Sequence, residues 1–119
     1  MMSAHDHLNP KQFRTLGDGA SRITVLSVDG DEKGYVRHTE HPDGSLEVNW
    51  LESHEQGKGY GTALMEHLYQ TRPEMDIDWG DLVHPVSEHL YGKFEDKYPH
   101  RTRFSGVSVS NMYDEDEEH

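Results

Sequence analysis

A glycine-rich run between residues 55 and 61 has the composition of a phosphate-binding loop. Glycines at positions 57, 59 and 61 surround Lys58 and Tyr60, and an apolar pattern at helical spacing follows over Thr62–Gln70. Glycine lets an anion approach the main chain closely, and the first turn of a helix offers N–H groups that have no intrahelical partner. A strand, a glycine loop and a helix in this order therefore predict a binding site for a pyrophosphate.

Two familiar phosphate-binding patterns do not fit this loop. The loop of nucleoside triphosphatases requires Gly-Lys followed by Ser or Thr, but Gly59 follows Lys58. The dinucleotide fingerprint requires a glycine at the position that Thr62 occupies. The run that begins at Gln56 fits a third pattern, Q/R-x-x-G-x-G/A.

Three strands are expected ahead of the loop. Runs rich in β-forming residues cover Ile23–Val28, Lys33–His41 and Ser45–Leu51, and turn-forming residues separate them. Such short connections predict an antiparallel meander. In the third run apolar residues alternate from Leu46 to Trp50, which predicts that these two side chains share one apolar face.

Further elements are expected after the loop. The helix should end before Pro73, because proline disfavours a helical conformation in the preceding residue. Met75–Trp79 is expected to form a strand parallel to the third one, through a right-handed crossover. Val86–Tyr98 is expected to form a second helix with Pro85 in its first turn, and Arg103–Val109 a closing strand.

Composition limits the classes of function. The chain has 119 residues, a net charge of -12 and no cysteine, which predicts one domain without disulfides or thiolate metal sites. The negative charge argues against binding to nucleic acid. No apolar run reaches membrane-spanning length and no secretory signal is present, so a cytoplasmic protein with no membrane association is expected.

The expected organisation has three parts. Residues 1–20 lack periodicity and are expected to be a flexible arm, which Phe13 and Leu16 could pin to the body. Residues 21–110 should form a single domain with an α/β (α+β) mixed sheet. Residues 111–119 are an acidic tail and are expected to be disordered.

The loop from Gln56 to Gly61 resembles the acyl-CoA pyrophosphate loop of the GNAT family of N-acetyltransferases. A second stretch, from His84 to Phe94, is similar to the family pattern N-x-x-A-x-x-L-Y-x-K-x-G-F; Leu90, Tyr91 and Lys93 match it. The resemblance covers residues from about 22 to 98. It implies a GNAT-like sheet, in which a three-strand meander precedes strand, loop, helix, strand and helix.

The chain departs from the family at both ends. Only about 20 residues precede Ile23, where the family has a strand and two helices that help to wall the acceptor site, and a single weak strand replaces the usual two closing strands. A short sheet leaves edges and an apolar face exposed, so a homodimer is a reasonable hypothesis.

The resemblance implies an N-acetyltransferase that uses acetyl-CoA as cosubstrate, with direct attack of a primary amine in a ternary complex. The acceptor would be an amine-bearing small molecule or peptide. The residues that the resemblance assigns to coenzyme binding are Trp50, Leu51, Gln56, Gly57, Lys58, Gly59, Tyr60, Gly61 and Thr62. Each also has a simpler interpretation, as a glycine turn or as core packing.

Tyr91 matches the tyrosine that protonates the leaving thiolate in many family members, and a phenol suits that task. Its alternative role is packing in the core. Glu47 and Glu52 are candidates for the general base, and His54 and His84 are further ones. The ten histidines are scattered without a metal-binding spacing, so no metal is expected.

Two other classes of function compete with this interpretation. One is a catalytically degenerate domain of the same fold that binds CoA or another protein, as a bacterial or phage accessory protein would. The other is an acidic mimic of nucleic acid, which depends on net charge alone.

Overall fold

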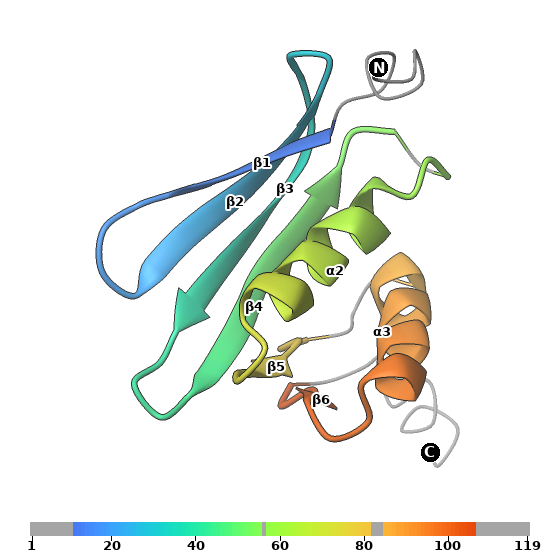
Figure 1. Cartoon of the computed structure of the whole chain (residues 1–119). Coiled ribbons are helices and arrows are strands. Elements are labelled where there is room, and N and C mark those ends of the chain that lie inside the picture. The colour runs from blue at the N-terminus through green and yellow to red at the C-terminus, as the bar shows by residue number, and fades with distance from the viewer. Residues whose placement is uncertain (1–10, 56, 82–84, 107–119) are drawn as a thin grey trace, which may run out of the picture.

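A computed structural model of the chain describes residues 11–55, 57–81 and 85–106. They form a six-stranded sheet whose strands lie side by side in the order of the sequence (Figure 1). The strands are β1 (Lys11–Leu16), β2 (Ser21–Val28), β3 (Asp31–Glu40), β4 (Ser45–Ser53), β5 (Asp76–Asp78) and β6 (Thr102–Arg103). Strands β1 to β4 pair antiparallel, whereas β5 is parallel to β4 and β6 is parallel to β5.

Two helices make the parallel connections and cover one face of the sheet. Helix α2 (Tyr60–Thr71) joins β4 to β5, and helix α3 (Pro85–Lys97) joins β5 to β6. Both lie on the same side of the sheet (Figure 1). Tyr69 of α2 is buried and stacks on Phe94 of α3, with 5.1 Å between the ring centroids. The helices and the sheet enclose one apolar core, so the fold is the mixed α/β sheet that the sequence predicted.

Most elements lie where the sequence placed them. The antiparallel meander, the helix that ends before Pro73 and the helix that begins at Pro85 are confirmed. Strand β5 is the expected parallel neighbour of β4. The closing strand is Thr102–Arg103 instead of Arg103–Val109, and residues 107–109 lie outside the described residues.

The amino-terminal arm requires a correction. Lys11–Leu16 form a strand that pairs along its whole length with β2, so the sheet begins ahead of the expected boundary at residue 21. Phe13 does pin this segment, because its ring stacks on His67 of α2 at 4.2 Å between centroids. Residues 1–10 and the acidic tail lie outside the described residues, and the expectations for them stay predictions.

A β-bulge at Asn49 reverses the side-chain parity of β4. Val48 and Trp50 pair with consecutive residues of β3, which leaves Asn49 between them without a partner on that strand. Before the bulge Leu46 faces the core, and after it Leu51 packs against the core while Trp50 is 56% exposed. The prediction that Trp50 shares the apolar face of Leu46 is therefore wrong, because a bulge shifts the alternation by one residue.

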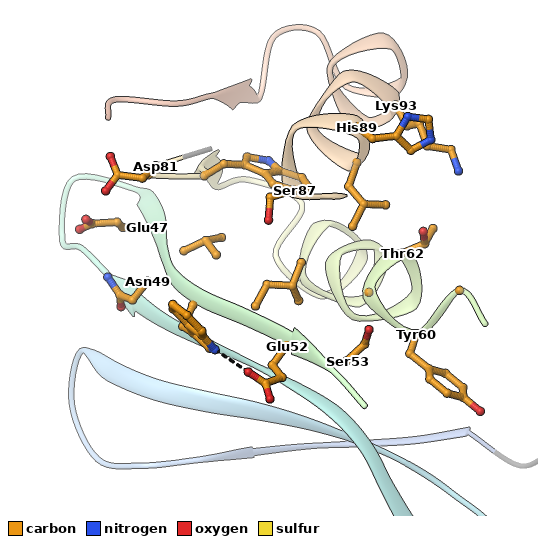
Figure 2. Close-up of a pocket in the computed structure, with 18 of the residues that line it drawn as sticks. Glu47, Asn49, Glu52, Ser53, Tyr60, Thr62, Asp81, Ser87, His89 and Lys93 are labelled. Atoms are coloured by element: carbon orange, nitrogen blue, oxygen red, sulfur yellow. Dashed lines mark hydrogen bonds between the residues drawn. The ribbon is translucent and has the colours of Figure 1, made fainter. Parts of the chain in front are cut away.

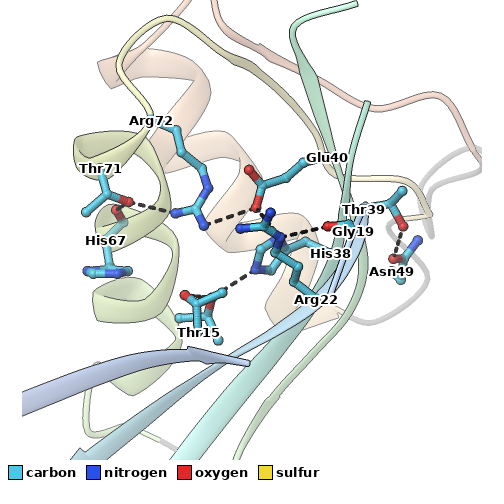
Figure 3. A network of polar contacts seen from close by, with 11 residues as sticks. Thr15, Gly19, Arg22, His38, Thr39, Glu40, Asn49, His67, Thr71 and Arg72 are labelled. Atoms are coloured by element: carbon cyan, nitrogen blue, oxygen red, sulfur yellow. Dashed lines mark hydrogen bonds and ion pairs between the residues drawn. The ribbon is translucent and has the colours of Figure 1, made fainter. Parts of the chain in front are cut away.

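A buried polar network links the meander to the end of α2 (Figure 3). His38 of β3 is fully buried, and its Nε2 lies 2.8 Å from Thr24 Oγ1. Its Nδ1 is 3.4 Å from Glu40 Oε2, which also accepts a hydrogen bond from Arg72 Nη2 at 3.1 Å. Burial lowers the pKa of His38 to about 4, and the Arg72 guanidinium acts in the same direction. The ring is therefore neutral at neutral pH.

Candidate functional site

The candidate site lies where β4 and β5 part. These strands pair only over Ser45–Glu47 and Asp76–Asp78, and β4 then continues to Ser53 without a β5 partner. A cleft of about 1060 Å³ occupies the splay, between the free end of β4, the first turn of α2 and one face of α3 (Figure 2). Crevices at the carboxyl ends of parallel strands are common ligand sites.

The structure brings most of the predicted site residues to this one cleft. Seven of the nine predicted coenzyme-binding residues line it, together with both candidate bases, Glu47 and Glu52. The seven are Trp50, Leu51, Gly57, Gly59, Tyr60, Gly61 and Thr62. Lys58 is not among the lining residues, and Gln56 lies outside the described residues.

The glycine loop presents bare main chain to the cleft. Gly57 and Gly59 have φ angles of 78° and 79°, and a Cβ atom at either position would meet no heavy atom within 4 Å. Gly59 is the N-cap of α2, and its carbonyl accepts the first helical hydrogen bond, from Ala63 N–H at 2.9 Å. The N–H groups of Tyr60–Thr62 have no intrahelical acceptor, and the first turn holds no acidic residue. The positive end of the helix dipole at the cleft therefore suits an anion.

The third glycine has a packing role. A Cβ atom at Gly61 would lie 3.2 Å from Leu90 Cδ1 of α3 and 3.9 Å from Leu51 Cδ2 of β4. The first of these contacts is tighter than ordinary van der Waals packing. A larger residue at this position would require the end of the Leu90 side chain to shift by a few tenths of an ångström, so Gly61 allows α3 to pack closely against the start of α2.

The cleft reaches both faces of the sheet. On β4, Leu51 and Ser53 belong to the side that the helices cover, whereas Glu47, Trp50 and Glu52 have the opposite parity. All five line the cleft. Two ligands can therefore approach the same splay from opposite sides of the sheet.

The two candidate bases occupy different ends of the cleft. Glu47 holds the last paired position, opposite Asp78, and its Oε1 lies 3.1 Å from His41 Nε2. Glu52 lies toward the glycine loop, and its Oε1 accepts a hydrogen bond from Trp50 Nε1–H at 3.0 Å (Figure 2). At roughly 3.3 Å per residue the two positions are about 15 Å apart along the strand. The two carboxylates are therefore too far apart to contact one reacting atom together.

Tyr91 is not among the residues that line the cleft. Its side chain is nearly buried, and its ring packs edge-on against Trp79 and Phe104. Its hydroxyl donates to Glu95 Oε2 at 3.3 Å, and burial together with the Glu95 carboxylate raises the pKa of Tyr91. The structure therefore supports the packing role of Tyr91, and its assignment as the acid stays a prediction.

Asp78 organises the wall opposite β4. Its Oδ1 accepts hydrogen bonds from Gly80 N–H at 2.9 Å, from Ser105 N–H at 3.1 Å and from Ser105 Oγ at 3.2 Å. Gly80 and Ser105 both line the cleft. One carboxylate thus joins the segment after β5 to the segment after β6.

The polar side chains at the cleft that were not predicted as site residues include Asn49, His89 and Lys93. The strand pattern hides Asn49, because it is the bulge residue. His89 and Lys93 are four residues apart on α3, and this spacing was visible in the sequence. His54, a predicted alternative base, is not a lining residue and has its Nδ1 3.1 Å from a β3 carbonyl oxygen; His84 lies outside the described residues.

Among residues 11–55, 57–81 and 85–106, no group of three or more His, Cys, Asp or Glu residues could hold a metal ion. Neither helix in this part of the chain is long and apolar enough to span a bilayer.

Among solved structures, the chain is similar to acetyltransferases, two of which are described here. No protein-family model matches the sequence, and no curated protein matches it. A candidate acetyltransferase of the GNAT family from Desulfovibrio desulfuricans is 22% identical with a TM-score of 0.40, over 45% of this chain and 37% of that protein. Ribosomal-protein-alanine N-acetyltransferase from Brucella melitensis biovar Abortus 2308 is 21% identical with a TM-score of 0.44, over 68% and 62%. The chain spans less than two thirds of the length of either protein.

Proposed function

We propose that this protein is an acetyl-CoA-dependent N-acetyltransferase that transfers an acetyl group to a primary amine by direct attack in a ternary complex. One observation carries the proposal: a bare glycine loop, a helix N-terminus and an unpaired strand edge converge on one cleft. The resemblance of Gln56–Gly61 to the GNAT acyl-CoA loop supplies the chemical identity of the ligand.

The cleft matches the shape and polarity of an acyl-CoA. Acetyl-CoA supplies a diphosphate, a long arm with amide groups and a reactive thioester. The N–H groups of Tyr60–Thr62 would hold the diphosphate at the start of α2. The arm would then extend along Val48–Ser53, where β4 has no β5 partner and its main-chain groups face the splay. In this direction the acyl group would lie at the closed end of the seam, near Glu47.

The amine acceptor would approach from the face that the helices leave uncovered. Glu47 has the parity of that face and lies at the closed end of the seam, so we assign it the role of general base. Glu47 takes the proton of the amine, and the amine nitrogen forms a bond to the carbonyl carbon. The carbon–sulfur bond then breaks, and coenzyme A leaves as a thiolate that takes up a proton from solvent or from the acid candidate Tyr91. Glu52 lies about 15 Å from Glu47 along the strand and instead orients Trp50.

Coenzyme binding is tested by calorimetry with acetyl-CoA and with S-acetylpantetheine, which lacks the diphosphate. We expect acetyl-CoA to bind much more tightly. At a hundredfold excess over its dissociation constant, acetyl-CoA should stabilise the protein by about 2.7 kcal/mol. Equal affinity for the two compounds would contradict a diphosphate site at Tyr60–Thr62.

Catalysis is tested with acetyl transfer to polyamines, aminoglycosides and lysine peptides. Glu47→Gln should lower kcat by about a hundredfold, whereas Glu52→Gln should leave kcat close to that of the wild type. Tyr91→Phe tests the leaving-group acid, and unchanged turnover would reject that assignment.

A second candidate function is a domain of the same fold that binds CoA or another protein without catalysis. The position of Tyr91 outside the cleft favours it. Tight binding of acetyl-CoA with no transfer to any amine in the panel would support this alternative.

A further inference from the structure

The sheet face opposite the helices carries two cross-strand rows of side chains. These rows follow from the register of the strands. The bulge on β4 sets which residues of that strand belong to them, since Trp50 and Glu52 lie on this face after it. The first row is Leu16, Ile23, Arg37 and Trp50, and the second is Arg14, Val25, Tyr35 and Glu52. Leu16 and Trp50, the large apolar side chains that are exposed among the described residues, stand at the two ends of the first row, 43% and 56% exposed.

In each row, the residue at one end suits contact with the residue at the other end of the same row in a second copy. A two-fold axis parallel to the strands, between β2 and β3, would place β1 over β4 of a second copy. Arg14 then lies opposite the partner's Glu52, and Leu16 opposite the partner's Trp50. Closed symmetric dimers use one self-complementary patch in this way, and sheets pack face to face about 10 Å apart.

We propose that this face is a homodimer interface in which β1 of one copy lies over β4 of the other. Opposite charges support a second copy as the occupant, because the basic and acidic ends of the Arg14–Glu52 row exchange places under the two-fold axis. A shallow hollow of about 580 Å³ beside Leu16, lined also by Ile23 and Arg37, provides room for the partner's Trp50 indole. Val25 and the partner's Tyr35 meet in the middle of the face.

The arrangement also completes the wall of the cleft. Trp50 and Glu52 line both the cleft and this face, so the partner's β1 would lie beside the side from which an amine approaches. Strand β1 ends at Leu16, and the turn that follows it would therefore border Glu47 of the other copy. The dimer itself does not depend on acetyl transfer, and its test uses no coenzyme.

The interface is small. Four strands about 4.8 Å apart make each row about 19 Å long, and two rows that occupy about four residues of each strand span about 13 Å in the other direction. The flat area is therefore about 250 Å² for each copy, the size of a weak, transient contact. We therefore expect a dissociation constant in the micromolar range.

Sedimentation velocity at concentrations up to about 0.5 mM, well above a micromolar dissociation constant, tests the proposal. The wild type should shift toward twice the 13.7 kDa of one chain as concentration rises. Arg14→Glu and Glu52→Arg should each weaken the dimer by about tenfold, because each creates two like-charge pairs. The double variant should regain most of the affinity, since the two charges exchange positions.

Lys11→Glu is the matched control. Lys11 is exposed on the same strand, but it has the parity of Phe13 and the helix-covered side. The Lys11→Glu substitution changes the net charge by the same amount as Arg14→Glu, and it should leave the dimer intact. A wild type that stays monomeric, a Lys11→Glu effect as large as that of Arg14→Glu, or no recovery in the double variant would each overturn the proposal.

Discussion

Replacing His38 with glutamine should make the protein less sensitive to mild acid. His38 is fully buried, and its Nε2 lies 2.8 Å from Thr24 Oγ1, a position that a glutamine side-chain amide can also reach. Burial lowers the pKa of His38 to about 4 in the folded state, whereas an unfolded histidine titrates near its ordinary value of about 6.5. Between these two values the unfolded chain binds a proton that the folded chain does not bind, so stability falls as the pH falls from about 6.5 toward 4.

The size of the effect follows from the two pKa values. Linkage gives a loss of about 2 kcal/mol between pH 7 and pH 5, and of about 3 kcal/mol once the pH is below 4. The pKa values of Glu40 and Glu66 are lowered from the ordinary glutamate value, so these carboxylates remove little stability above pH 5. Histidines therefore dominate the pH dependence of stability between pH 7 and pH 5. The pKa of His67 is also lowered, by burial and by Arg72, so the difference between His38→Gln and the wild type, which both contain His67, isolates the contribution of His38.

Urea unfolding at pH 7, 6 and 5 measures this contribution as a change in the free energy of unfolding. His38→Gln should lose about 2 kcal/mol less than the wild type over this range. The exposed His100 provides a matched control, because His100→Gln should follow the wild-type slope. Identical pH slopes for His38→Gln and wild type would refute the argument, since they would mean that the buried ring does not remain neutral.

Three further substitutions test the packing around the cleft. Gly59→Ala should destabilise the protein by about 1 kcal/mol, because an alanine at a φ of 79° is strained, and thermal unfolding should show a lower Tm. Tyr69→Phe removes a hydroxyl that lies 2.7 Å from Thr102 Oγ1 and accepts a hydrogen bond from Trp79 Nε1–H at 3.1 Å. Urea unfolding should show a free energy of unfolding that is lower by about 1–3 kcal/mol. No loss would mean that water replaces the hydroxyl. Asp78→Ala removes an acceptor of three hydrogen bonds and should weaken acetyl-CoA binding in calorimetry by loosening the far wall, whereas unchanged affinity would show that this wall is not needed.

The fold was predictable wherever a local pattern and its tertiary environment agree. The helix after the glycine loop buries Leu64 and Tyr69 as its apolar spacing predicts, and the turn at Pro42–Ser45 is closed by Asp43, whose Oδ1 accepts from Ser45 N–H at 3.0 Å. Strand β1 was not predictable, because Lys11–Leu16 lies at the sheet edge with mostly exposed side chains. Pairing with β2 and the single Phe13 contact with α2 hold it in place.

The candidate site was predictable in its main chain and less so in its side chains. The glycines from 57 to 61 identify the loop directly, since few other roles require three of them at this spacing. Which side chains reach the cleft depends on the side of each helix or strand that faces the splay. A sequence pattern shows which residues share a side, but it does not show which side faces the splay. On α3, for example, Tyr91 hydrogen-bonds to Glu95 away from the cleft, while Lys93 lines it.

The bulge at Asn49 decides which side chains β4 offers to each side of the seam. If Asn49 instead paired with Arg37 in a regular strand, every later side chain of β4 would change sides, which would carry Trp50 into the core and turn Leu51 out toward water. Deleting Asn49 would not have this effect, because Trp50 would then follow Val48 directly and keep its place opposite Arg37. A substitution beside the bulge that favours regular pairing would therefore exchange the groups offered to the two sides of the seam with no change in chain length.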